Sequence, residues 1–432
     1  MNKTAKRAIP IVALVLVGGG VWLRLTKFES AKPSVRLEQE NAIVGRELGL
    51  KVGDSKSGVA EVKVEAVQGG RSFALYEEKF PRGTPLVEKM LPMHPLPQGL
   101  NEGDVQIRIT AKDHSWNGGN ITVLEKKMIV DTQPPQVSLI GGPHYIRQGG
   151  AGLITFKTNE EAPATGIQVG DHFFQGYPAG ANRYLAYYAL PYGEPKEISI
   201  GGVAEDAAGN RGSFRFRPVV KPKAFKKDTI KVGREFLDGI IPYFKERDAS
   251  LKGTDLEIFL SVNRTQRESD YQQILKICRD TAPRPLWSGP FLRLPNSKPM
   301  ASFGEERTYL YEGREIDRQI HLGIDLASLA QSPIPAANSG RVVFAGPLGI
   351  YGNTVILDHG CGLFSMYCHL SLIQVEVKKE VAKGDSLGRS GSTGLAGGDH
   401  LHYAMLVQGI FVDPIEWWDA HWIKDNIELK MK

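Results

Sequence analysis

The chain has few cysteines: three in 432 residues, at Cys278, Cys361 and Cys368. Three thiols cannot all pair within one chain, and no two of them have the CxxC spacing of a metal knuckle. If residues 355–357 and 364–368 form a hairpin, Cys361 lies in its turn, too far from Cys368 for a disulfide. The sequence therefore predicts three small buried side chains rather than a disulfide framework.

The chain also lacks a strong charge of either sign. Its 53 Lys and Arg residues against 48 Asp and Glu leave a net charge of +5, with no concentrated basic stripe. Nucleic-acid binders need such a stripe, so we expect no nucleic-acid partner. A slight positive charge does not repel an anionic polymer such as a cell wall. The length predicts two to four domains.

Long apolar runs are absent except near the N-terminus, where Lys3, Lys6 and Arg7 precede an apolar stretch over residues 8–23. A charged start followed by such a run is typical of an export signal. No small-x-small cleavage site follows, so we favour an uncleaved membrane anchor over residues 1–31, with a cleaved signal as the alternative. Basic residues on both sides leave the orientation open. The short N-terminal tail favours export of the rest of the chain.

Short alternating runs between Gly, Pro and Asn turns make residues 33–220 β-rich. A weak internal repeat is present, because a turn from Asp113 to Asn120 and another from Asp206 to Asn210 each join two such runs. Each repeat has roughly the length of an immunoglobulin-like sandwich.

We therefore predict two Ig-like β domains, over residues 32–131 and 132–225, whose D…GN turn resembles that of bacterial Ig-like domains. Spacer modules are the simpler interpretation of these domains. A ligand or partner site on them is the alternative, and an envelope protein is a candidate partner for them or for the helical region that follows.

The period becomes helical in the region that we expect to link the domains, residues 226–300. Two apolar stripes have i, i+3, i+4, i+7 spacing: Leu237, Ile240, Ile241, Phe244 and then Tyr271, Ile274, Leu275, Cys278. Thr265 and Glu268 have capping-box spacing and predict the start of the second helix, and Pro242 predicts a kink or end in the first. The stripes indicate packing against a neighbour, and an arm that covers an active site is the alternative.

Residues 301–432 return to a β pattern with Gly-rich turns, which predicts a compact antiparallel sheet. Six of the ten histidines lie between positions 321 and 421. His400 and His402 alternate on a strand and share a face. His321 and Asp325 are four apart, with Gly323 between them allowing close backbone approach. Two imidazoles and a carboxylate can hold Zn²⁺ and leave one position open for water.

In sequence order, these motifs resemble those of the lysostaphin-type, LytM-like zinc endopeptidases that cut cell-wall peptide bridges. The resemblance covers roughly residues 301–416. It is carried by His321-Leu-Gly-Ile-Asp325, Ala336-Ala-Asn-Ser-Gly340, Tyr351-Gly-Asn-Thr-Val, Asp358-His-Gly, Tyr367-Cys-His369-Leu-Ser, Lys383-Gly-Asp, the run from Gly388 to Gly394, and His400-Leu-His402.

The resemblance implies one zinc ion held by His321, Asp325 and His402, and two further active-site histidines, His369 and His400. None of the five positions is substituted. Zinc lowers the pKa of a bound water toward roughly 7, and the two non-ligand histidines are expected to accept its proton and stabilise the oxyanion. The Gly-rich run 388–398 is expected to form one wall of the substrate groove, with a plain hairpin loop as the alternative.

Three neighbouring residues have more than one interpretation. Asp399 can orient a histidine or be a solvated turn residue, which we favour. We favour a structural role in a hairpin turn for His359 over metal ligation, and packing or surface exposure for His421.

The sequence thus predicts a mainly β protein of the bacterial envelope, anchored in the inner membrane with its bulk in the periplasm, or secreted if the signal is cleaved. Its predicted function is zinc-dependent hydrolysis of peptide stems and cross-bridges of peptidoglycan. The first alternative is a non-catalytic wall-binding protein that activates other wall hydrolases. The second is a purely structural zinc, disfavoured because a His/His/Asp set is unlike a closed site.

Overall fold

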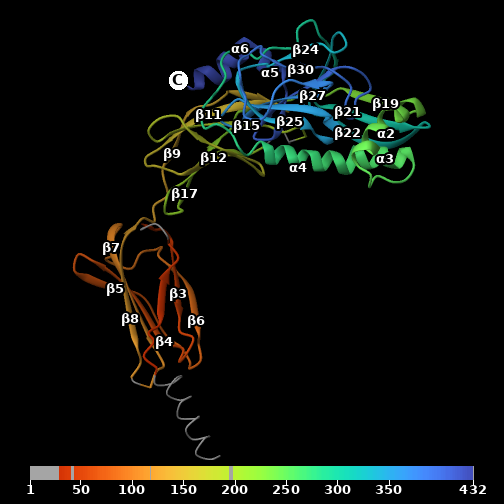
Figure 1. The fold of residues 1–432 in the computed structure, drawn as a ribbon. Coiled ribbons are helices and arrows are strands. Elements are labelled where there is room, and N and C mark those ends of the chain that lie inside the picture. The colour runs from red at the N-terminus through yellow and green to blue at the C-terminus, as the bar shows by residue number, and fades with distance from the viewer. Residues whose placement is uncertain (1–28, 40–42, 117, 194–197, 432) are drawn as a thin grey trace, which may run out of the picture. The chain divides into compact units, whose positions relative to one another are not determined.

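The protein, seen in a computed structural model, forms two compact units (Figure 1). The first holds Met1–Pro135 with Glu205–Arg211, and the second holds Gln136–Ala204 with Gly212–Lys432. The structure describes residues 29–39, 43–116, 118–193 and 198–431. Strands predominate there, so the mainly β prediction is confirmed. The finer division at residues 32, 132, 226 and 301 stays a prediction.

Most of the predicted membrane anchor, residues 1–28, lies outside the described residues. In the part of the chain that the structure describes, no helix has both the length and the apolar character needed to cross a bilayer. The anchor is therefore untested by the fold.

Two sheets enclose one core in the first unit. Alternating residues of β3 and β6 on one sheet, and of β4 and β7 on the other, are buried together. This arrangement is that of a sandwich, while its Ig-like character stays a prediction. The sheet orders are β1 (Ser34–Leu37), β3 (Glu47–Gly53), β6 (Leu86–Pro92), and β2 (Ile43–Val44), β8 (Ile121–Val130), β7 (Gly103–Asp113), β4 (Val59–Gln68), β5 (Arg71–Lys79).

The second unit begins with another β region. It holds two four-stranded sheets and one short parallel pair. The sheet orders are β14 (Tyr177–Pro178), β15 (Arg183–Ala189), β11 (Ala151–Thr158), β9 (Val137–Gly141); then β13 (His172–Gln175), β12 (Ala164–Val169), β16 (Ile200–Glu205), β17 (Arg211–Phe216); and the pair β10 (Tyr145–Arg147), β18 (Val219–Lys221). Its core is continuous with that of the C-terminal region.

The helical region contains α2 (Arg234–Arg247) and a continuous run of α3 (Asp255–Ser261), the π-helical turn η1 (Val262–Gln266) and α4 (Arg267–Ile277). The first predicted apolar stripe is buried on α2, as expected, and α2 continues through Pro242. The predicted capping box is wrong. Thr265 lies inside η1, and the reciprocal hydrogen bonds form between Thr254 and Glu257 instead, so the helical run begins eleven residues earlier.

The C-terminal sheet has eight strands. Its order is β20 (Lys298–Ala301), β23 (Ile324–Ala327), β31 (Leu401–Val407), β27 (Leu363–Leu370), β26 (Asn353–Asp358), β25 (Gly340–Pro347), β29 (Glu380–Val381), with β32 (Ile410–Val412) paired to β31. β27 and β31 are buried along their whole length, and every pairing in this sheet is antiparallel, as predicted.

The remaining elements of this region form two three-stranded sheets and several short helical turns. They are β19 (Lys227–Lys231), β21 (Glu305–Tyr311) and β22 (Arg314–His321) in one sheet, β24 (Pro333–Pro335), β30 (Ser386–Arg389) and β28 (Leu372–Ile373) in another, η2 (Gly349–Tyr351), α5 (Ile415–Trp418), α6 (Ala420–Ile423), η3 (Lys424–Glu428) and α7 (Leu429–Met431).

The cysteine prediction is confirmed. β26 and β27 form the expected hairpin, and Cys361 lies in its turn with a φ of 53°. All three cysteines are buried and unpaired. Burial raises the pKa of the Cys361 thiol to about 12, so this side chain stays protonated and unreactive at neutral pH.

Candidate metal centre

Three side chains from separate strands converge on one point. His321 Nε2 lies 3.0 Å from Asp325 Oδ1 and 3.0 Å from His402 Nδ1, and His402 Nδ1 lies 2.9 Å from Asp325 Oδ1. All three residues are buried. Two imidazole nitrogens and one carboxylate oxygen at these distances from one another form a donor set that can bind a metal cation.

The sheet register creates this convergence. Asp325 on β23 is the direct antiparallel partner of His402 on β31, and His321 ends β22 just before the bend that leads into β23. Gly323 lies in that bend. A Cβ at this position would meet His402 Cε1 and Nε2 at 2.5 Å, so the close approach expected of this glycine is what admits the His402 ring.

Hydrogen bonds to carbonyl oxygens fix the ring orientations. His321 Nδ1 lies 3.0 Å from the carbonyl oxygen of Ser302, which can only accept, so this nitrogen carries the proton and Nε2 presents its lone pair. His402 Nε2 is buried and has no hydrogen-bond partner among the described residues. Its ring is therefore positioned by packing against Gly323 and by Asp325 rather than by a second hydrogen bond.

The two other histidines lie beside the three. The ring of His369 is 4.9 Å from that of His400 and 5.8 Å from that of His402, measured between centroids. His369 Nδ1 donates to Thr393 O and His400 Nδ1 donates to Gly398 O, each at 2.8 Å. Both Nε2 atoms are thus left to face the cluster, and that of His400 lies 3.5 Å from Asp325 Oδ1.

The electrostatics of the cluster keep two imidazoles neutral. Burial lowers the pKa of His402 to about 4, against the opposing effect of Asp325. Burial, together with the charges of His400 and His402, holds the pKa of His369 well below its usual range. Burial raises the pKa of Asp325, but His321 and the other imidazoles outweigh it, so the net shift is downward. A neutral imidazole and an ionised carboxylate are the forms that bind a metal.

The donor set fits zinc better than a harder cation. Two nitrogens and one oxygen match the mixed N/O preference of Zn²⁺, while Ca²⁺ and Mg²⁺ prefer oxygen alone. The structure thus brings together the three residues predicted as ligands and places the two predicted catalytic histidines next to them. The roles themselves remain predictions.

The cluster opens into a cavity of about 240 Å³. Leu395, Ala396 and Gly397 of the Gly-rich run are among its lining residues, and their role as a substrate-groove wall stays a prediction. Other lining residues come from segments outside the motifs: Ile230, Phe236, Arg267, Arg307, Tyr309. The helical region therefore contributes Phe236 and Arg267 to the cavity, while the first apolar stripe is buried on α2 and the second is buried only at Ile274 and Cys278.

Arg307 was missed by sequence reasoning. Its Nη2 donates to Asp325 Oδ2 at 3.0 Å, the oxygen that does not face the histidines, and its Nε lies 3.4 Å from Glu305 Oε1. Arg307 is on β21, eighteen residues before Asp325, and no motif marks it. The guanidinium lies at the cluster because β21 pairs with β22, the strand that ends at His321.

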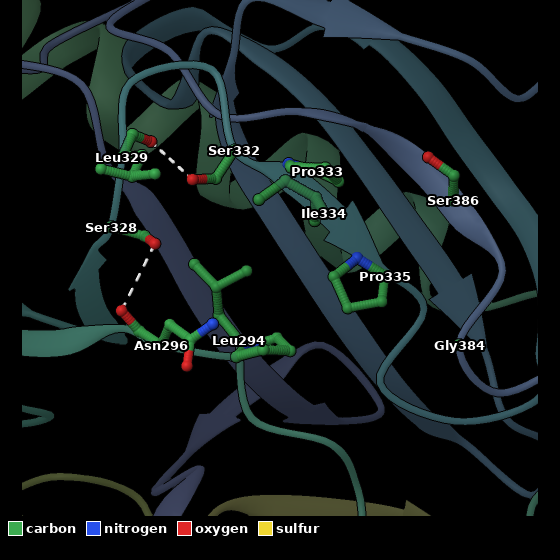
Figure 2. A pocket seen from close by; sticks show the side chains of 11 residues that line it. Leu294, Asn296, Ser328, Leu329, Ser332, Pro333, Ile334, Pro335, Gly384 and Ser386 are labelled. Atoms are coloured by element: carbon green, nitrogen blue, oxygen red, sulfur yellow. Dashed lines mark hydrogen bonds between the residues drawn. The ribbon is translucent and has the colours of Figure 1, made fainter.

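A larger hollow, of about 640 Å³, lies elsewhere on the second unit (Figure 2). Its lining contains no acid, imidazole or thiol: Leu294, Pro295, Asn296, Ser328, Leu329, Ser332, Pro333, Ile334, Pro335, Gly384, Ser386. Ser332 Oγ donates to Leu329 O and Ser328 Oγ to Asn296 O across its rim. This larger hollow therefore lacks the imidazole and carboxylate groups that line the smaller cavity.

The residues with open interpretations now have observed contacts. Asp399 bonds to no histidine. It is half-buried in a bend and accepts from Ser390 Oγ and from the backbone N of Gln331, so the role of orienting a histidine finds no support and the turn position is as expected. His359 has Nδ1 bonded to Ser339 O and Nε2 bonded to Ser365 Oγ, which agrees with a structural role. His421 is exposed.

The C-terminal region of the chain is similar to a known protein family. The model of peptidase family M23 matches residues 319–414, which contain the five predicted site residues. The DD-carboxypeptidase/endopeptidase Mpg of Neisseria meningitidis is 37% identical over 97 residues, which are 22% of this chain and 22% of that protein. The peptidoglycan DD-endopeptidase ShyA of Vibrio cholerae is 37% identical over 89 residues, 21% of each chain.

The chain thus spans about a fifth of the length of these two curated relatives. A shorter relative, lipoprotein NlpD of Yersinia enterocolitica, is 36% identical over 94 residues, which are 22% of this chain and 96% of that protein. The matched segment contains the three candidate metal ligands and the two histidines beside them. Through its C-terminal region, this chain belongs to peptidase family M23.

Proposed function

We propose that this protein is a zinc-dependent endopeptidase that hydrolyses the peptide cross-links of bacterial peptidoglycan. The observation that supports it most is the convergence of His321, Asp325 and His402 beside a second pair of histidines. An intact set of three ligands and two polar neighbours at a cavity is what metal-assisted hydrolysis requires. The names of Mpg, a DD-carboxypeptidase/endopeptidase, and of ShyA, a peptidoglycan DD-endopeptidase, support the substrate class.

In this proposal His321, Asp325 and His402 would hold the zinc ion, and a bound zinc ion would supply Lewis acidity, which lowers the pKa of water. His369 and His400 would accept the proton of the attacking water and stabilise the developing oxyanion. Their Nδ1 protons are committed to Thr393 O and Gly398 O, so both rings present Nε2 to the cavity. The ring geometry is fixed before substrate enters, which favours the transition state.

The substrate peptide runs through the cavity between two walls. The Gly-rich run supplies one, with Ala396 and Gly397 offering little side chain to obstruct an extended chain. Phe236, Tyr309 and Arg267 supply the other. An apolar wall that carries a guanidinium fits a peptide with both methyl and carboxylate groups.

We further propose that the protein works in the cell envelope, with residues 1–31 anchoring it in the inner membrane and two Ig-like spacers between anchor and enzyme. The names of the relatives support an envelope location, since NlpD is a lipoprotein and ShyA a peptidoglycan enzyme. Membrane attachment and domain boundaries each need a direct measurement, such as fractionation of cells and limited proteolysis.

The decisive experiment compares wild type, His402→Ala and His421→Ala for zinc content and for digestion of purified peptidoglycan. We expect His402→Ala to lose bound zinc and hydrolysis together, because it removes a ligand. His421→Ala removes an exposed histidine and should behave as wild type. Full hydrolysis by a zinc-free His402→Ala protein would make the site assignment wrong.

The same experiment tests the two alternatives. Wild type that binds zinc and peptidoglycan without cleaving either stem or cross-bridge would favour a wall-binding activator of other hydrolases. A structural zinc would show itself as unfolding of His402→Ala in circular dichroism, with hydrolysis lost only in proportion to the unfolded fraction. The cavity beside the cluster favours the catalytic hypothesis over both.

A further inference from the structure

We propose that the first unit carries a calcium site formed by Glu29, Asp54 and Asp113. Each of the three can place one carboxylate oxygen within 4.8 Å of the others, and all three residues are buried. None of them lies in the segment matched by the peptidase family. The site is therefore separate from the zinc chemistry and independent of the proposed function.

Two loops hold the aspartates in place. Asp54 follows β3, and its Oδ1 accepts from the backbone N of Lys56, Ser57 and Gly58 at 3.0, 2.9 and 2.8 Å. Asp113 ends β7, and its Oδ1 accepts from the backbone N of Ser115 and Asn120. These bonds fix the direction of each carboxylate, but neutral donors leave its charge in place.

Two buried oxygens at the cluster have no hydrogen-bond partner among the described residues: Glu29 Oε2 and Ser57 Oγ. Glu29 is 4% exposed and Ser57 is 2% exposed. Ser57 N donates to both Glu29 Oε1 and Asp54 Oδ1, so the serine lies between two of the carboxylates. Buried polar oxygens normally have a partner, and a cation held by the cluster would supply one to both.

The charges point to a divalent cation. Three carboxylates meet, and among the residues that the structure describes one cation pairs with the cluster: the half-exposed Lys56, whose Nζ lies 3.7 Å from Glu29 Oε2. One ammonium leaves two negative charges in excess inside a buried cluster. Buried charges need partners, and a single divalent ion would neutralise that excess.

The donors select calcium. The cluster offers carboxylate and hydroxyl oxygens, without the nitrogen or sulfur that zinc prefers. Ca²⁺ takes six to eight oxygen ligands in flexible geometry, including several carboxylates, whereas Mg²⁺ demands an octahedron and keeps most of its water. Three preformed carboxylates beside a serine hydroxyl match the calcium pattern.

The bound ion would join three stretches of chain. The carbonyl oxygen of Glu29 already accepts from Ser115 Oγ and Asn120 Nδ2, each at 3.1 Å. Its side chain reaches the 54–58 loop through Ser57. Calcium at the carboxylates would lock residue 29 to both loops and so fix the point where the chain enters the first β unit.

Calcium binding is tested on the full chain by calorimetry and by amide hydrogen exchange, with Ca²⁺ added to about 10 mM, since extracellular modules bind it at roughly 0.1–1 mM. We expect uptake of calcium and slowing of exchange in segments 54–58 and 113–120 by about tenfold, the factor for ligand at ten times its dissociation constant. Glu29→Gln and Asp54→Asn should each lower the calcium stoichiometry by one per chain. Calcium should also no longer slow amide exchange in these variants, since each keeps an acceptor oxygen but loses a negative charge.

Two controls separate this site from others. Asp104→Asn removes an exposed carboxylate of β7 and should keep the full response. His402→Ala removes a proposed zinc ligand and should also keep it, so the result does not depend on the peptidase assignment. Absence of calcium uptake by wild type, an unchanged response in Asp54→Asn, or equal slowing by Mg²⁺ would each overturn the proposal. If Glu29→Gln fails to fold, wild type and Asp54→Asn still decide it.

Discussion

Two sets of buried titratable side chains in the second unit differ in where their polar atoms point. The converging set is His321, Asp325 and His402 with His369 and His400 beside them. The isolated set is His359 and Glu416, each bonded to its own local partners. Burial brings the pKa of His402 and of His359 to about 4 alike. Burial alone therefore does not distinguish a candidate metal ligand from a structural histidine. The convergence of ring nitrogens on one point does distinguish them.

The local partners of the isolated set explain its structural role. His359 bonds at 2.7 Å to Ser339 O and at 2.7 Å to Ser365 Oγ, with the ring of Phe291 at its edge. Glu416 on α5 accepts from the backbone N of Ala151 in β11. Both ring nitrogens of His359 are thus occupied, and Glu416 is bonded within the fold, while the converging set faces a cavity. The predictions below, in order of expected effect, test this distinction.

The largest effect is expected for His369→Ala. Loss of a positioned acid–base group lowers turnover by about 10²–10⁴-fold. Zinc should remain bound, because His369 is not one of the three converging ligands. Turnover on peptidoglycan and zinc content are measured on the same sample. Loss of zinc from this variant would make His369 a ligand and move it into the metal set.

His359 should affect stability rather than activity. Its folded-state pKa of about 4 is below the unfolded value, so the unfolded chain takes up the proton first and stability falls as pH falls from 6.5 toward 4. The contribution is about 3 kcal/mol at 1.36 kcal/mol per pKa unit. Denaturant unfolding of wild type and His359→Gln at pH 7 and pH 4.5 measures it. An equal loss in both proteins would contradict this assignment.

Glu416 should act with the opposite sign. Burial raises its pKa to about 7, so the folded state keeps a proton that the unfolded state has released, and stability falls as pH rises from 4.5 through 7. Glu416→Gln keeps an acceptor for Ala151 N and removes the charge. The variant should gain up to about 3 kcal/mol relative to wild type at pH 8 and little at pH 4.5. A gain independent of pH would show that charge is not the cause.

The smallest effect is expected for Arg307→Gln, which removes the guanidinium that orients Asp325. Partners of metal ligands typically contribute about 10–100-fold to metal affinity. Competition with a zinc chelator measures the affinity, and Arg318→Gln, an exposed arginine on the neighbouring strand β22, is the control. A rise in zinc affinity would show that Arg307 acts chiefly as a competing positive charge.

Sequence reasoning succeeded where chemistry is carried by short motifs and failed where it depends on pairing across the sheet. His321, Asp325 and His402 were predicted as a set, and the structure brings them together with the close approach at Gly323, while their role as ligands stays a prediction. Arg307, Arg267 and Phe236 were missed, because they reach the cavity from segments that share no motif with it. The predicted capping box at Thr265 was wrong because the same local pattern recurs at Thr254, and only the latter starts a helix.

By itself, the sequence determined which side chains can hold a metal, the mainly β composition, and the buried unpaired state of the cysteines, because each depends on residue type or short-range periodicity. Only the tertiary structure decided that Asp325 faces His402 across two strands, that the helical region supplies part of the cavity wall, and that Glu29 meets Asp54 and Asp113. Strand register and loop closure set those distances, and both depend on long-range packing that no local pattern encodes.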